Sequence, residues 1–338
     1  MPSLTGSSNE REPIPQQDIP GRRRLSAFGV TIASEHPFTF NLATVTGAPE
    51  LTFDCVGQAP LRVDWDDSSP LYATREQMPT GESAGAIVRL PDCYVLRFLG
   101  AADFFVWPDR IVCHLRDPDY AFAVEIWLLG TVLAFWLEQR GIPALHAASV
   151  EVEGRCIAFL ATNKGGKSSL AASFLQAGHR LVGDDILPLE RRDGLFLGRP
   201  GYPQMRLWPE QARYFAGSDA GLKRVHPRLE KLRVPIGANG FGEFASQAGP
   251  VAGLYLPERH ERDEIEIEAL PLSEALPELL RQSFLSTIIE TTGLEAQRFR
   301  FFAGLLREVP VKRLRYPSGN HHLPSVRDAL LNDLGSTS

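Results

Sequence analysis

Short apolar runs, separated by Pro, Gly and Asp, follow a polar beginning of the chain. Residues 1–24 are rich in Ser, Pro, Gln, Glu and Arg and show no periodicity, which is typical of a disordered tail. From residue 25 to residue 118, runs of strand length predict a small β-rich N-terminal module. The clearest runs are residues 28–32, 51–56, 86–90 and 94–99.

A long apolar segment begins the second predicted domain, which spans residues 119–334. Residues 119–140 predict a helix that ends at Gly141. Its apolar core is short for a bilayer crossing, which needs about 20 apolar residues, and it contains Glu125. We therefore expect a helix buried inside the protein and no membrane partner.

Strand and helix patterns then alternate, which predicts an α/β domain with a mixed sheet. Glu153-Gly154 joins two strand patterns in a tight turn, and Gly178 ends the helix that comes next. The predicted strands are residues 145–152, 156–161, 180–187, 251–256, 264–270 and 309–316, and the predicted helices are residues 168–177, 272–291, 295–306 and 324–334.

The turn between the second of these strands and its helix has the sequence ATNKGGKS, residues 161–168. It matches the phosphate-loop pattern G-x-x-x-x-G-K-[ST], except that Ala161 replaces the first Gly. Backbone N–H groups in such a loop bind phosphate, the Lys reaches the outer phosphates and the Ser hydroxyl is a ligand of Mg²⁺. A plain glycine turn that exposes a helix start is the alternative. The predicted ATP-binding residues are Asn163, Lys164, Gly165, Gly166, Lys167, Ser168 and Ser169.

Two carboxylates and a histidine flank this loop. Asp184 and Asp185 end an apolar strand, where a phosphate-loop enzyme needs one carboxylate for Mg²⁺ and one to accept the proton of the attacking hydroxyl. A pair of Asp residues in a turn is the alternative. Neighbours on a strand point to opposite faces, so we expect the two to have different roles unless the strand ends between them. His146 lies on a neighbouring strand, either as a satisfied core residue or as a partner that tunes the pKa of the catalytic Asp.

Residues 145–185 as a whole resemble the catalytic core of HPr kinase/phosphorylase, which carries a His, a phosphate loop and a Gly-His-Arg-Leu-Val-x-Asp-Asp stretch. The resemblance implies a P-loop domain of the type shared with ATP-dependent phosphoenolpyruvate carboxykinase. It also implies phosphate and Mg²⁺ roles for Lys167 and Ser168. Asp184 would be the catalytic base, and Asp185 would orient metal or phosphate. The Gly-rich segment that the family links to its reverse phosphorylase reaction is not found after Asp185.

The later sequence is similar to HPr-kinase-like proteins of ribosomal peptide pathways, especially lasso-peptide kinases. The similar segments are GYPQMRLWP from Gly201, HPRLEK from His226 and VPVKRLRYP from Val309. This resemblance implies transfer to a serine hydroxyl of a precursor peptide. Arg206 and Lys231 lie in these segments and are candidate catalytic cations, because phosphoryl transfer needs positive charge near the transferred group. A solvated charged loop is the alternative for each.

Composition limits the remaining choices. The net charge of −6 argues against general attraction to nucleic acid or anionic membranes. Residues 1–24 hold no apolar core of a signal peptide, so we expect a cytoplasmic protein. The favoured function is an ATP- and Mg²⁺-dependent serine kinase acting on a peptide or small protein. A small-molecule kinase and a non-catalytic ATP-binding regulator remain open, as does the oligomeric state, a homo-oligomer included.

Overall fold

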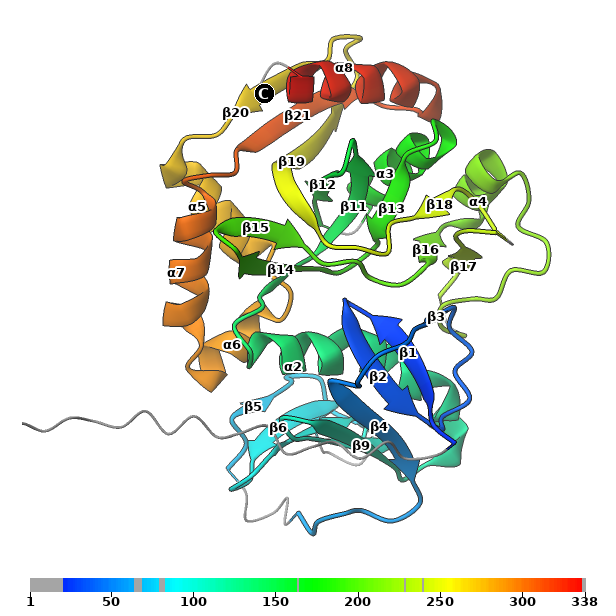
Figure 1. The fold of residues 1–338 in the computed structure, drawn as a ribbon, viewed down its shortest axis with the longest axis vertical. Helices are drawn as coiled ribbons and strands as arrows, with labels where there is room; N and C mark the ends of the chain where they lie inside the picture. The colour runs from blue at the N-terminus through cyan, green and yellow to red at the C-terminus, as the bar shows by residue number, and fades with distance from the viewer. Residues whose placement is uncertain are drawn as a thin grey trace, which may run out of the picture.

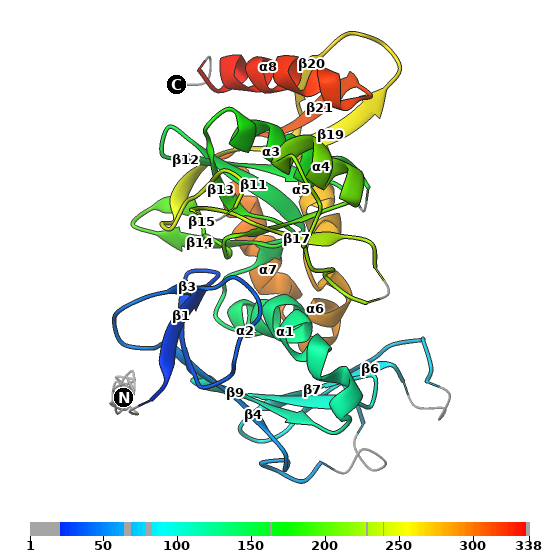
Figure 2. The same cartoon turned by 90° about the vertical axis from the view of Figure 1, so that its right-hand side faces the viewer.

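A long helical segment separates two β-sheets in the computed structural model, which describes residues 21–63, 69–78, 83–162, 164–227, 229–238 and 240–335 (Figures 1 and 2). The protein is therefore of the mixed α/β class. The first sheet contains only residues from the N-terminal third, and the second begins after the helical segment.

The N-terminal sheet has nine strands in the order β3-β1-β2-β4-β9-β8-β7-β6-β5. Most neighbours are antiparallel, but β4 pairs in parallel with both β2 and β9. The strands are β1 (Arg23–Ala27), β2 (Val30–Ser34), β3 (Ala43–Thr44), β4 (Leu51–Val56), β5 (Tyr72–Ala73), β6 (Gly85–Arg89), β7 (Tyr94–Phe98), β8 (Ala102–Val106) and β9 (Arg110–Leu115).

Two details of this module differ from the sequence prediction. The expected tail over residues 1–24 lies mostly outside the described residues, but its last part is structured, because β1 begins at Arg23 and Arg22 forms an ion pair with Asp54. The predicted strand over residues 28–32 is wrong at its start. Phe28 and Gly29 both have positive φ and form the turn between β1 and β2. Hydrophobicity at Phe28 marks a buried turn residue rather than a strand residue.

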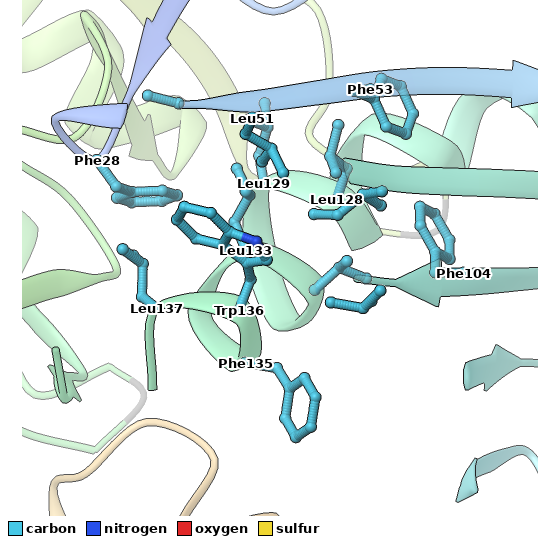
Figure 3. Packing of buried hydrophobic residues seen from close by; sticks show 14 of the residues in the cluster. Phe28, Leu51, Phe53, Phe104, Leu128, Leu129, Leu133, Phe135, Trp136 and Leu137 are labelled. Carbon is cyan, nitrogen blue, oxygen red and sulfur yellow. The ribbon is translucent and has the colours of Figure 1, made fainter. Parts of the chain in front are cut away.

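The helical segment between the sheets runs from η1 (Pro118–Ala123) through α1 (Val124–Trp127) and η2 (Leu128–Val132) to α2 (Leu133–Glu138). By length and composition it is apolar enough to cross a membrane, but most of it is buried inside the protein. Leu128, Leu133 and Trp136 pack with Phe53 and Phe104 of the N-terminal sheet (Figure 3). A division after residue 118 would therefore cut through one hydrophobic core.

The second sheet has apolar residues on both faces of its central strands. Ala148, Val150, Ile157 and Phe159 pack on the side of α3 and α8. Their neighbours along the same strands pack on the opposite side, against α5 and α7, so the sheet is the middle of three layers. Burial on both faces explains why these strands have nearly continuous apolar sequences.

The order of this sheet is β10-β14-β15-β19-β12-β11-β13-β18, with β21 beside β19 and β20 beside β21. Its strands are β10 (Ala144–Leu145), β11 (Ala147–Val152), β12 (Arg155–Leu160), β13 (Arg180–Gly183), β14 (Leu187–Arg192), β15 (Leu195–Gly198), β18 (Glu243–Phe244), β19 (Gly249–His260), β20 (Glu266–Ala269) and β21 (Val311–Pro317). A two-stranded ribbon, β16 (Gln204–Leu207) and β17 (Leu232–Pro235), stands apart from it. The other helices are α3 (Lys167–Gln176), α4 (Pro209–Ala216), α5 (Leu272–Arg281), α6 (Ser286–Thr292), α7 (Glu295–Leu305), η3 (Asn320–His322) and α8 (Leu323–Gly335).

The structure interrupts some of the predicted elements. The strand expected over residues 145–152 bends at His146, between β10 and β11. The helix expected over residues 272–291 is interrupted after Arg281, and Leu285 adopts a positive φ before α6 begins. The strand expected over residues 180–187 is interrupted after Gly183, and Leu187 starts β14. The chain continues in the same direction, because β13 pairs with β11 and β14 pairs with β10 in one antiparallel register. The bend between the two strands consists of Asp184, Asp185 and Ile186. The apolar Ile186 after the acidic pair hid this interruption in the sequence.

Candidate active site

The predicted phosphate loop connects β12 to α3 at the edge of the central sheet. The structure explains both glycines, because a Cβ on Gly165 would lie 2.4 Å from the Cβ of Ala161. A Cβ on Gly166, whose φ is +89°, would lie 2.6 Å from the Tyr316 hydroxyl. No side chain caps α3 at Gly166, and the first N–H groups of a helix have no partner within it. The loop therefore offers a backbone cradle with donors free for an anion.

Lys167 folds back over this loop. Its Nζ lies 2.5 Å from the Ala161 carbonyl oxygen, 3.3 Å from that of Thr162 and 3.1 Å from His146 Nε2. The side chain is nearly buried, and burial lowers its pKa. Neutral acceptors hold the ammonium beside the loop, and no carboxylate forms a salt bridge with it among the described residues. The charges of Asp184 and Asp185 act on the ammonium from a greater distance, and a polyphosphate would supply a direct anionic partner.

Ser168 connects the loop to the acidic pair. Its hydroxyl donates to Asp184 Oδ1 over 2.8 Å, and the second oxygen of Asp184 accepts the backbone N–H of Arg206 over 2.7 Å. Because the serine proton is directed at Asp184, the oxygen lone pairs of Ser168 remain available to a cation. The structure thus brings together residues that are 16 positions apart in the sequence.

Asp184 and Asp185 lie in the bend between β13 and β14, and both line the same pocket. Asp185 has a φ of +81°, a conformation that Asp tolerates better than most residues and that often occurs at functional sites. Burial raises the pKa of Asp184, and the charge of Asp185 adds to this effect. Burial acts in the same sense on Asp185, but the positive charges around it, that of Arg206 first, together outweigh burial and leave the pKa of Asp185 below its usual value. The two carboxylates therefore differ in their tendency to hold a proton.

His146 lies in a bend between β10 and β11 and contacts both parts of the site. Its Nδ1 lies 2.9 Å from the backbone oxygen of Asp185 and 3.5 Å from Oδ1 of that residue. Burial lowers the pKa of His146, which favours a neutral ring. In that state Nδ1 donates to the Asp185 carbonyl and Nε2 accepts from Lys167. His146 therefore contacts Lys167 and the backbone of Asp185, and these two hydrogen bonds do not involve Asp184.

Arg206 lies on β16 and connects the acidic pair to the N-terminal module. Its Nη1 is 2.6 Å from Asp185 Oδ2, and its Nη2 donates to the Tyr202 hydroxyl over 3.2 Å. The Tyr202 ring is in edge contact with Phe28 and Phe40 of the N-terminal module. The backbone N–H of Phe28 also donates to the carbonyl of Gly201. The module therefore buttresses the residues that fix the guanidinium.

A pocket of about 450 Å³ collects the predicted site residues, a size suited to one small ligand. Asn163 lies outside the described residues. The predicted residues that line the pocket are His146, Lys164, Gly165, Gly166, Lys167, Ser168, Ser169, Asp184, Asp185, Arg206 and Lys231.

Sequence reasoning missed a further group of lining residues. Arg259 lies near the end of β19, and its Nη2 donates to the Lys164 carbonyl over 2.7 Å. Gln211, on the first turn of α4, accepts a hydrogen bond from the Ser169 hydroxyl. The sequence alone could not show that Arg259 lies near the loop, because this follows from the parallel pairing of β12 with β19. Trp208 and Gln211 could have been found, because they lie at the start of a helix close to Arg206. The additional lining residues are Leu207, Trp208, Glu210, Gln211, Glu230 and Arg259.

The donor set fits Mg²⁺ bound together with a polyphosphate. Among the described residues, no group of three or more His, Cys, Asp or Glu could hold a metal alone. Mg²⁺ is usually bound by one or two protein oxygens together with waters and substrate phosphates. Ser168 and Asp185 are hard oxygen ligands of this kind, and Asp184 lies next to them.

Comparisons with known proteins add little to this geometry. No protein-family model and no curated protein matches the chain. Among solved structures, the chain is similar to the HPr(Ser) kinase/phosphatase from Coxiella burnetii, with 12% sequence identity and a TM-score of 0.28 over 57% of this chain and 93% of that chain. Because this TM-score is low, the functional proposal below rests on the site itself.

Proposed function

We propose that the protein is an ATP-dependent kinase that transfers the γ-phosphate to a hydroxyl group. The observation that carries the proposal is the hydrogen bond between Ser168 of the phosphate loop and Asp184 of the acidic pair. It joins a backbone cradle for phosphate to Asp184, one of two half-buried neighbouring carboxylates of different proton affinity. A structural glycine turn would need neither the carboxylates nor the cations around them.

In this mechanism the chain provides position and charge. The loop N–H groups bind the polyphosphate and Lys167 binds its outer phosphates. Asp184, whose pKa is raised by burial, accepts the proton of the attacking hydroxyl. Arg206 and Lys231 stabilise negative charge on the transferred group. Mg²⁺, held by Ser168 and Asp185, would neutralise charge on the phosphates.

For the acceptor, we propose a serine hydroxyl of a peptide or small protein. Support comes from the resemblance of residues 145–185 to HPr kinases and of the segments around Arg206 and Lys231 to kinases of lasso-type precursor peptides. The pocket volume suits a single small ligand. A nucleotide can occupy the pocket while a larger molecule presents its serine hydroxyl at the rim.

The test is transfer of phosphate from labelled ATP–Mg²⁺ to candidate acceptors, followed by mass spectrometry. Peptides that end in Ser, matched peptides that end in Ala, and free serine are offered in parallel. We expect a phosphate on the Ser peptide only. Lys167→Ala should weaken ATP binding and transfer, whereas Asp184→Asn should retain ATP binding and lose transfer. Normal turnover by Asp184→Asn would refute the mechanism, and phosphorylation of free serine alone would identify a small-molecule kinase.

A further inference from the structure

The three residues that begin α3 point to different parts of the pocket. Lys167 reaches His146, and Ser168 reaches Asp184. Ser169 instead hydrogen-bonds to Gln211 of α4, over 3.2 Å. Successive helical residues are rotated by about 100° around the axis. The side of the pocket formed by α4, here called the α4 wall, and the acidic pair therefore lie on different sides of the start of α3. A ligand whose phosphates lie on the loop can extend toward that wall.

Trp208 stands at this wall, just before α4 begins. It is the one Trp, Tyr or Phe among the described residues that line the pocket, and it is partly exposed there. Its backbone is extended and Pro209 opens the helix, which restricts the backbone that carries the indole. An indole left partly exposed in a pocket with mostly charged and polar lining is available for stacking.

Two lysine ammonium groups lie near the indole from different segments. Lys164 Nζ, from the phosphate loop, is 5.5 Å from the ring centroid, and Lys231 Nζ, from the segment before β17, is 5.9 Å away. These distances are at the outer limit of a cation–π contact, so the long side chains are not locked in place. Lys231 lines the same pocket as Asp184 and Asp185, and its charge lowers the pKa of both carboxyl groups.

We propose that Trp208 is the stacking platform for the base of a purine nucleotide, a role that rests on the proposed ATP site. The base lies on the indole face, the phosphates lie on the loop, and the Lys164 and Lys231 ammonium groups turn from the ring toward the phosphates. Stacking of a base on an aromatic side chain strengthens binding about 5- to 150-fold. Trp208 is therefore a binding residue, and it takes no part in proton transfer.

Calorimetric titration separates the base from the phosphates. The two ligands are ATP–Mg²⁺ and ribose 5-triphosphate–Mg²⁺, which keeps the sugar and all three phosphates. For Trp208→Ala we expect ATP affinity to fall about 5- to 150-fold, with ribose triphosphate affinity unchanged. Trp208→Phe, the matched variant that keeps an aromatic ring, should retain most of the ATP affinity. Equal losses for both ligands, or no loss for either, would overturn the proposal.

Two controls keep this result distinct from a failure of the proposed function. Lys167→Ala should weaken both ligands, and if it weakens neither, the phosphate loop is not the nucleotide site. If Trp208→Ala does not fold, ATP-induced quenching of tryptophan fluorescence is compared between the wild type and Trp208→Phe. Quenching by ATP that ribose triphosphate does not cause, and that Trp208→Phe loses, supports stacking. Quenching that persists in Trp208→Phe contradicts it.

Discussion

The Cβ of Ala161 leaves no room for a side chain at Gly165. A Cβ added to Gly165 would lie only 2.4 Å from it. The motif therefore tolerates Ala at its first position because a glycine four residues later leaves room for it. The departure of the sequence from G-x-x-x-x-G-K-[ST] is a change in packing and does not remove the phosphate cradle.

This relationship predicts the effect of Gly165→Ala. We expect ATP–Mg²⁺ affinity to fall about 5- to 150-fold, because overpacking of this kind costs about 1–3 kcal/mol. Adding Ala161→Gly should restore part of the affinity, since the remaining close contact is 3.0 Å to the Thr162 carbonyl oxygen. Calorimetry measures both effects. Gly57→Ala, at a site with open space around it, is the control; equal affinity in all variants would contradict the packing argument.

Asp184→Asn is expected to stabilise the protein without ligand while abolishing transfer. A carboxyl group whose pKa is raised by folding contributes stability below its unfolded pKa, near 3.8, and this contribution is lost as the pH rises through the folded value. At neutral pH the ionised Asp184 therefore costs stability, which Asn does not. Thermal unfolding as a function of pH should show the variant melting a few degrees above the wild type at pH 7, with the gap closing in acid. A lower melting temperature for the variant at pH 7 would refute this.

Tyr202→Phe tests whether the N-terminal module supports catalysis through Arg206. The variant keeps the ring contacts to Phe28 and Phe40 and removes only the acceptor for Arg206 Nη2. A hydrogen bond contributes about 0.5–1.5 kcal/mol, so we expect kcat to fall about 2- to 10-fold with the KM for ATP nearly constant. Steady-state kinetics provide the measurement, and Tyr94→Phe in the N-terminal sheet is the control. An effect confined to KM would place Arg206 in ground-state binding instead.

The buried ion pair between Glu138 of α2 and Arg298 of α7 should be important for stability. Both side chains are almost fully buried, Arg298 Nε and Nη2 lie 2.9 and 2.5 Å from the two carboxylate oxygens, and Nη2 also donates to the Phe284 carbonyl. Removing one partner of such a pair costs about 3–5 kcal/mol, which we expect for Arg298→Met in denaturant unfolding. The double variant Glu138→Leu, Arg298→Met should recover most of this loss. A single variant as stable as the wild type would show that the pair is not needed.

Local sequence patterns predicted the parts of the fold that depend on local chemistry. The Glu153-Gly154 turn joins β11 and β12 as expected, because both residues adopt the positive φ of a two-residue hairpin. The phosphate-loop helix begins within a residue of its predicted start. The sequence could not show where the strand is interrupted around Asp184 and Asp185, since Ile186 continues the apolar pattern, nor that Phe28 lies in a turn.

The site was predictable only where its residues are close in sequence or belong to a motif. Arg259 was missed because its place beside Lys164 follows from the pairing of strands about 90 residues apart. The contacts of Tyr202 with Arg206, Phe28 and Phe40 likewise depend on packing between the N-terminal module and the segment before β16. No periodicity along one segment contains such information.

The helical segment of residues 118–138 also limits how the chain can be divided. Leu128, Leu133 and Trp136 are buried against the first sheet. Glu138 of the same segment forms an ion pair with Arg298 of α7, which packs on the second sheet. Deleting the first sheet would expose this apolar surface to water, at about 25 cal/mol for each Å². The first sheet and the rest of the chain are therefore not independent of each other. We expect a fragment that starts at residue 119 to aggregate rather than fold.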